Sequence, residues 1–151
     1  MGNVIDAGVC ISLERRRLGL QGLVTALGGE DCFITPITAS ELLHGLHRAR
    51  DPAIRSERKA FVEAAIQLFP LLPIDLDTAR VHARLSAELA SRGTAVGAHD
   101  LWIAASCKAR GHGIVTTNPR HFARVPGLPI KIWSEEGIRV YLPVHPGATD
   151  G

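Results

Sequence analysis

The chain has 151 residues, of which 46% are hydrophobic and 21% charged, with a formal net charge of +2. This length suits a single domain that buries a sizeable core, and the composition is ordinary for a globular protein. The small net charge excludes a strong overall attraction to nucleic acid. Residues 15–17 and 44–50 are nonetheless locally basic, which allows either a nucleic-acid contact or a solvated helix face.

The three cysteines exclude two common classes of protein. Cys10, Cys32 and Cys107 lie far apart and form no Cys-x-x-Cys pair, which fits neither a zinc site nor a secreted disulfide framework. Asp6 interrupts the only apolar stretch near the N-terminus, so a secretory signal is not expected. No apolar run has the length needed to cross a bilayer. We therefore expect a cytoplasmic protein that makes no contact with a membrane.

Apolar periodicity predicts that strands alternate with helices along the chain. In order, we expect a strand at 3–5, helices at 9–18 and 20–27, a strand at 32–35, helices at 38–49 and 53–68, a strand at 71–74, helices at 77–93 and 98–110, and strands at 113–116 and 130–132. This alternation predicts an α/β fold with a central, mainly parallel sheet and helices on both faces.

One helix start leaves the role of a carboxylate open. Thr38 and Glu41 have the spacing of a capping box, in which the acid hydrogen-bonds back to the first turn of its own helix. On this evidence, Glu41 is either a capping residue alone or part of a functional site.

Acidic and polar residues are expected at one edge of the sheet. Asp6 follows the strand at 3–5, Asp100 lies in the first turn of the helix at 98–110, and Asn118 follows the strand at 113–116. Functional sites of open parallel sheets gather at the carboxyl ends of the strands. Carboxylates brought together there repel one another unless a cation such as Mg²⁺ binds between them. The pattern therefore predicts a metal-dependent hydrolase.

Four segments carry a resemblance to a known family. Val4-Ile5-Asp6 with Val9-Cys10-Ile11, the segment 37–45 around Glu41, and the segment 97–105 around Asp100 resemble three motifs of PIN domains. The segment 115–122, with 125–128 and Trp133, is similar to the end of VapC toxins. The resemblance implies a three-layer α/β/α fold, with a PIN-like nuclease domain over 1–135 and a partly disordered C-terminal tail over 136–151.

The resemblance also implies an activity and its residues. VapC-like proteins are Mg²⁺-dependent (or Mn²⁺-dependent) ribonucleases that cleave structured RNA such as tRNA or rRNA and arrest translation. A VapB-like antitoxin neutralises them, and they commonly form homodimers. By this likeness Asp6 and Asp100 would bind the metal, Glu41 would complete the acidic cluster, and Asn118 would be a neutral ligand or orient a water.

Two departures from the family pattern leave a second interpretation open. Ala7 and Gly8 replace the polar residues that usually follow the first aspartate, and His121 stands where an acid usually precedes the phenylalanine. A degenerate PIN protein that binds RNA or an antitoxin without cleaving is therefore the alternative. A phosphatase with a nucleophilic aspartate is disfavoured, because that chemistry needs a second acid at position 8.

Overall fold

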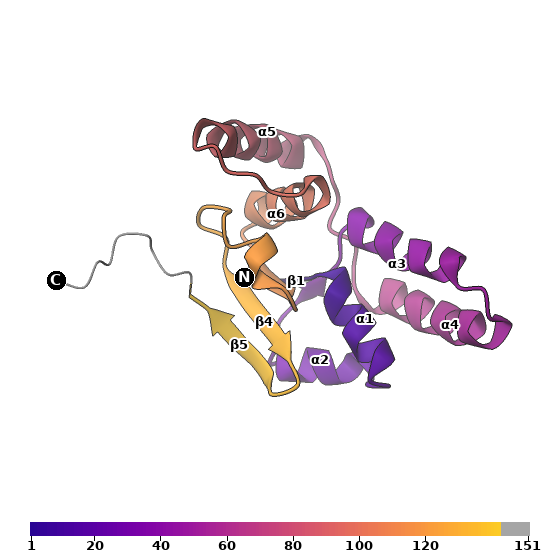
Figure 1. The fold of residues 1–151 in the computed structure, drawn as a ribbon. Coiled ribbons are helices and arrows are strands. Elements are labelled where there is room, and N and C mark those ends of the chain that lie inside the picture. Colours follow the sequence, from indigo (N-terminus) through magenta and orange to yellow (C-terminus); the bar gives the residue numbers. More distant parts are fainter. Residues whose placement is uncertain (143–151) are drawn as a thin grey trace.

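The structure is a computed structural model that describes residues 1–142 (Figure 1). Its helices are α1 (Ala7–Arg15), α2 (Leu20–Ala26), α3 (Pro36–Arg48), α4 (Pro52–Leu68), α5 (Leu76–Ser91) and α6 (Ala98–Arg110). Its strands are β1 (Asn3–Ile5), β2 (Cys32–Phe33), β3 (Gly113–Thr116), β4 (Ile130–Ser134) and β5 (Gly137–Tyr141), and a short 3-10 turn, η1 (Pro119–His121), follows β3. No helix among the described residues combines the length and the apolar character that crossing a membrane requires.

The strands form one mainly parallel sheet in the order β2-β1-β3-β4-β5. β1 lies between β2 and β3, with Asn3 opposite both Cys32 and Gly113, and these pairs are parallel. β4 is parallel to β3, whereas β5 returns antiparallel to β4. The predicted α/β class and the mainly parallel sheet are confirmed, and the carboxyl ends of β1 and β3 lie side by side.

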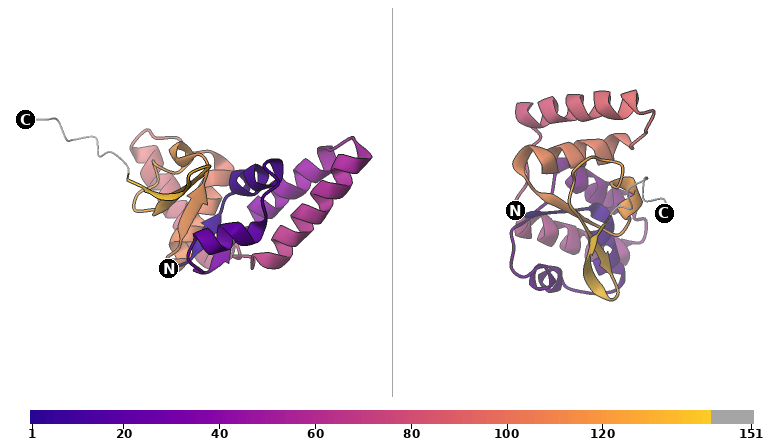
Figure 2. Two further views of the ribbon diagram at one scale, coloured as in Figure 1. Left: turned by 90° about the horizontal axis from the view of Figure 1, so that it is seen from below. Right: turned by 90° about the vertical axis from the view of Figure 1, so that its left-hand side faces the viewer.

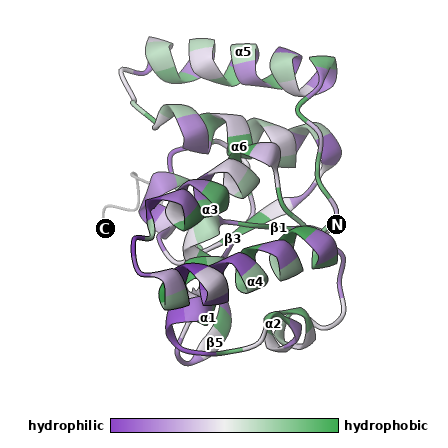
Figure 3. Cartoon of the chain, turned by 90° about the vertical axis from the view of Figure 1, so that its right-hand side faces the viewer, coloured by the Kyte–Doolittle hydropathy of each residue, from purple (hydrophilic) through white to green (hydrophobic). Residues whose placement is uncertain are grey.

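Alternate residues of the central strands face two different helical layers. Ile5 and Val115 pack in a cluster with residues of α1 to α4, whereas Val4 and Ile114 pack with residues of α5 and α6. All four of these strand side chains are fully buried, as expected for inner parallel strands covered on both faces. Figure 3 shows β1 and β3 passing between the helices, which confirms the three-layer arrangement.

Helices α3 and α4 form a hairpin that extends from the sheet (Figure 2). Pro36 and Pro52 occupy the first turns of α3 and α4, where a proline loses no helical hydrogen bond. The Asp51 side chain caps α4 by accepting from the backbone N–H groups of residues 53 and 54. Local helix-start signals therefore stabilise the two helices of the α3–α4 hairpin in addition to their packing.

Two predicted helix caps were wrong. Thr35, not Thr38, caps α3, and its Oγ1 accepts from the backbone N–H of Thr38 at 3.2 Å. The residue before a proline is held in an extended conformation, which is the conformation of an N-cap, so Pro36 fixes the helix start. For the helix expected at 77–93, Asp77 at its predicted start was the expected cap, but the cap of α5 is Asp75.

The predicted strand at 71–74 is also wrong. Leu71 makes only an isolated bridge with Ile34, because Pro70 and Pro73 have no N–H group with which to extend a ladder. At the other end, the sheet continues past the expected domain boundary at residue 135, since residues 137–141 form β5. The expected tail over 136–151 therefore includes a strand, and its remainder from residue 143 lies outside the described residues.

Candidate active site

The four residues predicted from the sequence line one pocket. Asp6, Glu41, Asp100 and Asn118 border an open pocket of about 500 Å³ at the carboxyl edge of the sheet. They come from the end of β1, from α3, from the first turn of α6 and from the loop after β3. His99, His121, Thr117, Ala7, Gly8 and Ile11 complete the lining. Residues spread over more than a hundred positions of sequence are thus brought together by the parallel topology.

Asp6 is held by two hydrogen bonds. It caps α1 through Oδ1, which accepts from the backbone N–H of Ala7 at 2.9 Å, and its Oδ2 accepts from Thr116 Oγ1 at 2.8 Å. Thr116 is fully buried, and the same Oγ1 accepts from the backbone N–H of Asn118 at 3.1 Å. Thr116 therefore provides side-chain support for Asp6 that Ala7 and Gly8 cannot give.

Sequence reasoning missed the role of Thr116. The available signal was a hydroxyl residue at the last position of a buried strand, next to the strand that ends in Asp6. A polar side chain buried there needs a hydrogen-bond partner, and the neighbouring strand end is the nearest place for one.

Gly8 and Thr117 explain part of the departure from the family pattern. A Cβ atom at Gly8 would lie 2.8 Å from Thr117 Oγ1, which is closer than real Cβ contacts. A larger residue at position 8 would therefore require Thr117 to move. The space that a polar side chain would need beside Asp6 is already partly filled by the Thr117 hydroxyl.

Two histidines contact the carboxylates. His99 Nδ1 lies 3.5 Å from Glu41 Oε1, and His121 Nδ1 lies 3.3 Å from Asp100 Oδ2. The other ring nitrogen of His121, Nε2, lies 3.0 Å from Asn118 Nδ2. Both imidazoles are largely exposed, with 71% and 55% of their side-chain surface accessible. The capping box is not formed, because Thr35 caps α3 and the Thr38 N–H donates to Thr35 Oγ1, so the interpretation of Glu41 as a capping residue is wrong.

The pocket disfavours negative charge on all three carboxylates. Burial raises the pKa of Asp6, the charge of Asp100 raises it further, and the hydrogen bond from Thr116 opposes the rise. Burial likewise raises the pKa of Glu41, with Asp6 adding to the effect, and burial raises the pKa of Asp100 against the opposing effect of His121. Acids with raised pKa values that share a pocket are typical of functional sites.

The donor chemistry of the pocket suits a hard cation. Asp6, Glu41 and Asp100 offer carboxylate oxygens and Asn118 offers an amide oxygen, which are ligand types that Mg²⁺ and Mn²⁺ accept. A bound cation would also offset the mutual repulsion that raises the pKa values of Asp6 and Glu41. Over residues 1–142, no three His, Cys, Asp or Glu side chains already converge as an ion site. The histidine contacts use one oxygen of each carboxylate, Oε1 of Glu41 and Oδ2 of Asp100, and leave the other oxygen of each acid for a cation.

Comparison with known proteins agrees with this site. The PIN domain family model matches residues 4–128, which is most of the chain and includes all four predicted site residues. The chain belongs to the PIN domain family, as the motifs predicted.

Within this family, the chain is similar to VapC proteins. Ribonuclease VapC of Rickettsia bellii is 32% identical over 130 residues, which cover 86% of this chain and 95% of the relative. The tRNA(fMet)-specific endonuclease VapC of Salmonella typhimurium is 37% identical over 100 residues, which cover 66% of this chain and 74% of the relative. The crystal structure of DNA-bound VapBC from Salmonella typhimurium superposes with a TM-score of 0.77 at 30% identity, covering 89% and 99% of the two chains.

Proposed function

We propose that the chain is a Mg²⁺-dependent endoribonuclease toxin of the VapC type, with Mn²⁺ as an alternative ion. Its substrate would be structured RNA such as tRNA or rRNA, and cleavage would arrest translation. The observation that carries the proposal is the convergence of Asp6, Glu41 and Asp100 on one pocket, where burial raises the pKa of each. The ribonuclease names of the relatives support the same activity.

Each residue of the pocket would have a distinct task. Asp6 and Asp100 would hold the metal directly, and Glu41 would complete the acidic set. When bound, the metal supplies a more acidic water and stabilises negative charge on the phosphate. Thr116 keeps Asp6 oriented through its hydroxyl hydrogen bond, in the way that residues behind metal ligands usually do. The Asn118 amide, which contacts His121, would orient a water or the phosphate.

The same likeness implies a protein partner. Several solved structures similar to this chain are VapBC complexes, and some of them contain DNA. We therefore propose a VapB-like antitoxin as the natural inhibitor of this chain. The homodimer expected from the resemblance stays a prediction.

A degenerate binding protein is the second candidate function. The contacts of Glu41 with His99 and of Asp100 with His121 favour it, because each histidine lies against an acid that a metal would otherwise bind. In that case the pocket would bind RNA or an antitoxin and cleave nothing.

An RNA cleavage assay separates the two candidates. Wild type and Asp100→Asn would be incubated with bulk tRNA and with rRNA, each with Mg²⁺, with Mn²⁺ and with a chelator. The ribonuclease proposal expects cleavage only by wild type and only with metal. If folded wild-type protein cleaves neither RNA with either ion, the degenerate candidate is favoured instead.

A further inference from the structure

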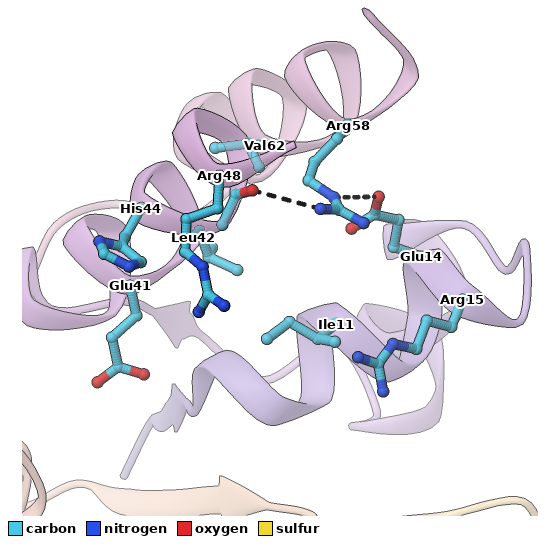
Figure 4. A pocket seen from close by; sticks show the side chains of 10 residues that line it. Ile11, Glu14, Arg15, Glu41, Leu42, His44, Arg48, Arg58 and Val62 are labelled. Carbon is cyan, nitrogen blue, oxygen red and sulfur yellow. Dashed lines mark hydrogen bonds and ion pairs between the residues drawn. The ribbon is translucent and has the colours of Figure 1, made fainter. Parts of the chain in front are cut away.

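A groove beside the acidic pocket brings together the two basic segments of the sequence. Its volume is about 450 Å³, and it lies between α1 on one side and α3 and α4 on the other (Figure 4). Arg15 belongs to the first basic segment, and His44 and Arg48 belong to the second. These segments are separated by about thirty positions, so only the fold places them on one surface. We call this surface the Arg15–Arg48 groove.

The groove is continuous with the acidic pocket. Glu41 lines both the groove and the pocket, and Ile11 of α1 does the same. A third hollow, lined by Gly8, Ile11, Arg15 and Thr117 among others, adjoins the pocket on the other side of Ile11. Arg15 therefore borders two hollows that each share residues with the acidic pocket. A polymer whose reacting group lies at Asp6 and Asp100 would pass directly over these surfaces.

Two of the three groove arginines are available to bind a ligand. Arg58 is already engaged, since its Nε contacts Glu14 Oε1 at 3.1 Å and its Nη1 donates to the Gly45 carbonyl at 3.3 Å. Arg15 and Arg48 are exposed, and neither makes an ion pair or a side-chain hydrogen bond with any residue between 1 and 142. In Figure 4 Arg48 extends from α3 into the opening toward Ile11, and Arg15 lies along the α1 wall.

Arg58 also fixes the spacing of the groove walls. Its contacts join α4 to α1 through Glu14 and to α3 through the carbonyl of Gly45. Both side chains of the Arg58–Glu14 pair are mostly buried, with 31% and 23% of their surface exposed. These contacts tie α4 to both α1 and α3, whereas Arg15 and Arg48 make no such contact within residues 1–142.

We infer that Arg15 and Arg48 bind phosphates of the substrate RNA that flank the cleaved bond and so position the strand over the acidic pocket. This inference rests on the proposed ribonuclease function and deepens it. A guanidinium binds a phosphate through two parallel hydrogen bonds, and phosphate contacts set the register of a nucleic acid without reading its sequence. Leu42 and Val62 of the groove are almost fully buried, whereas Arg15 and Arg48 are exposed and present their guanidinium groups to a ligand.

The arginines of the groove would also reduce the repulsion between the acidic pocket and RNA. Three carboxylates repel a polyanion, and RNA carries one negative charge per nucleotide. Cations placed beside the acids offset that repulsion and leave the metal position free. The two unpaired guanidinium groups therefore complement the charge of an RNA backbone.

RNA binding can be measured without cleavage. In an Asp100→Asn background, fluorescence anisotropy would follow binding of labelled bulk tRNA to variants with Arg15→Gln, Arg48→Gln or both, over a series of salt concentrations. Arg84→Gln is the matched control, because Arg84 is exposed on α5 and has no ion pair among the described residues. Arg48→Lys tests whether charge alone is enough, and thermal unfolding confirms that each variant is folded.

Each single arginine substitution should weaken tRNA binding about threefold to tenfold near 0.1 M salt, and the double variant should approach the product of the two effects. The slope of log affinity against log salt should fall by about one for each arginine removed, whereas Arg84→Gln should leave it unchanged. Arg48→Lys should recover part of the loss. With catalytic Asp100 restored, KM should rise while kcat stays within about twofold, because these contacts bind ground state and transition state alike.

Three results would overturn the inference. One is a double variant that binds tRNA as tightly as the Arg84→Gln control, and another is a parent protein that binds no tRNA at all. The third is unchanged tRNA binding with lost binding of a poly-glutamate peptide, which would assign the groove to an acidic protein segment. If wild type fails to cleave but the arginine variants still lose tRNA binding, the ribonuclease proposal fails while the groove assignment stands.

Discussion

Asp6 and Asp75 each cap the start of a helix, but their pKa values are shifted in opposite directions. Both are N-cap residues, and the side chain of each accepts a hydrogen bond from a backbone N–H of its helix. Asp75 also pairs with Arg110, and its hydrogen bonds from Thr78 together with this cation lower its pKa. Burial raises the pKa of Asp6, and its nearest charged neighbours include another acid, Asp100.

Under the proposed function, this difference distinguishes a structural carboxylate, Asp75, from a functional one, Asp6. Asp75 has its cation on the protein, so the α5 cap and the Arg110 contact are complete without a ligand. Asp6 is ordered by hydrogen bonds, and no lysine or arginine between residues 1 and 142 pairs with it, so under the proposed function a metal ion from solution would supply the missing positive charge. The buried negative charge of Asp6 lowers the stability of the fold, and such destabilising charges are typical of functional sites.

The largest expected effect is on catalysis. Asp6→Asn should lower Mg²⁺-dependent RNA cleavage by more than about 100-fold, because it removes a charged metal ligand without changing side-chain size. Asp75→Asn, the matched change at the other N-cap, should leave cleavage within about twofold. Initial rates of RNA cleavage measure both effects. If the two variants lose cleavage activity equally, Asp6 has no catalytic role that Asp75 lacks.

The hydroxyl groups that support the two carboxylates offer a second test. Thr116→Val removes the donor to Asp6, and Thr78→Val removes the hydroxyl that donates to Asp75 at 3.1 Å. Loss of a residue that orients a metal ligand typically costs about 10-fold to 100-fold in metal affinity. The Mg²⁺ concentration for half-maximal cleavage should rise by that factor in Thr116→Val and stay constant in Thr78→Val. A shift of similar size in both would point to general destabilisation.

A substitution at position 121 tests the site by adding an acidic group instead of removing one. His121→Asp replaces the imidazole beside Asp100 with a fourth anionic group, so Mg²⁺ binding should tighten by about tenfold. Isothermal titration calorimetry measures this directly. An unchanged affinity would mean that the side chain at position 121 turns away from the metal.

The smallest expected effect is on stability, and its sign differs between the two acids. The raised pKa of Asp6 means that its charge destabilises the fold above its ordinary pKa, and this penalty is complete once the pH exceeds the folded-state pKa. Asp6→Asn should therefore raise the Tm at neutral pH by about 2–4 °C without metal, as ~1 kcal/mol does for a chain of this length. This increase in Tm should vanish near pH 3, where the Asp6 carboxyl is mostly protonated in the folded and the unfolded state.

Asp75 should show the reverse. Its lowered pKa means that its charge stabilises the fold above its ordinary pKa, and this stabilisation is lost as the pH falls through the folded-state pKa. Asp75→Asn should therefore lower the Tm at neutral pH and have little effect in acid. Thermal scans at several pH values, monitored by circular dichroism, would measure both changes in Tm. A change of the same sign in Asp6→Asn and Asp75→Asn at neutral pH would contradict this prediction.

The sequence predicted the parts of the fold that depend on local signals. The helix from Ala98 to Arg110 and the strand from Gly113 to Thr116 have the predicted bounds, because Gly97 and Gly111 bracket the helix and a short apolar run follows. The errors occurred where two local signals competed. Pro36 prevailed over the capping-box spacing of Thr38, and the prolines at 70 and 73 prevailed over an apolar run.

The site residues were predictable, but their partners were not. Asp6, Asp100 and Asn118 could be placed together because the carboxyl ends of parallel strands share an edge, and the resemblance to PIN motifs added Glu41. The support from Thr116, the histidine contacts and the convergence of Arg15 with Arg48 depend on side-chain packing between distant elements. No spacing within the chain encodes such contacts, so the structure was needed to find them.

The central claim is that Asp6, Glu41 and Asp100 form one metal site. Its most direct test is a calorimetric titration of Mg²⁺ into wild type, Asp100→Asn and Asp75→Asn at neutral pH. If these acids form one site, Mg²⁺ should bind to wild type and to Asp75→Asn, and this binding should be lost in Asp100→Asn. Binding of Mg²⁺ to Asp100→Asn with the wild-type affinity would contradict it.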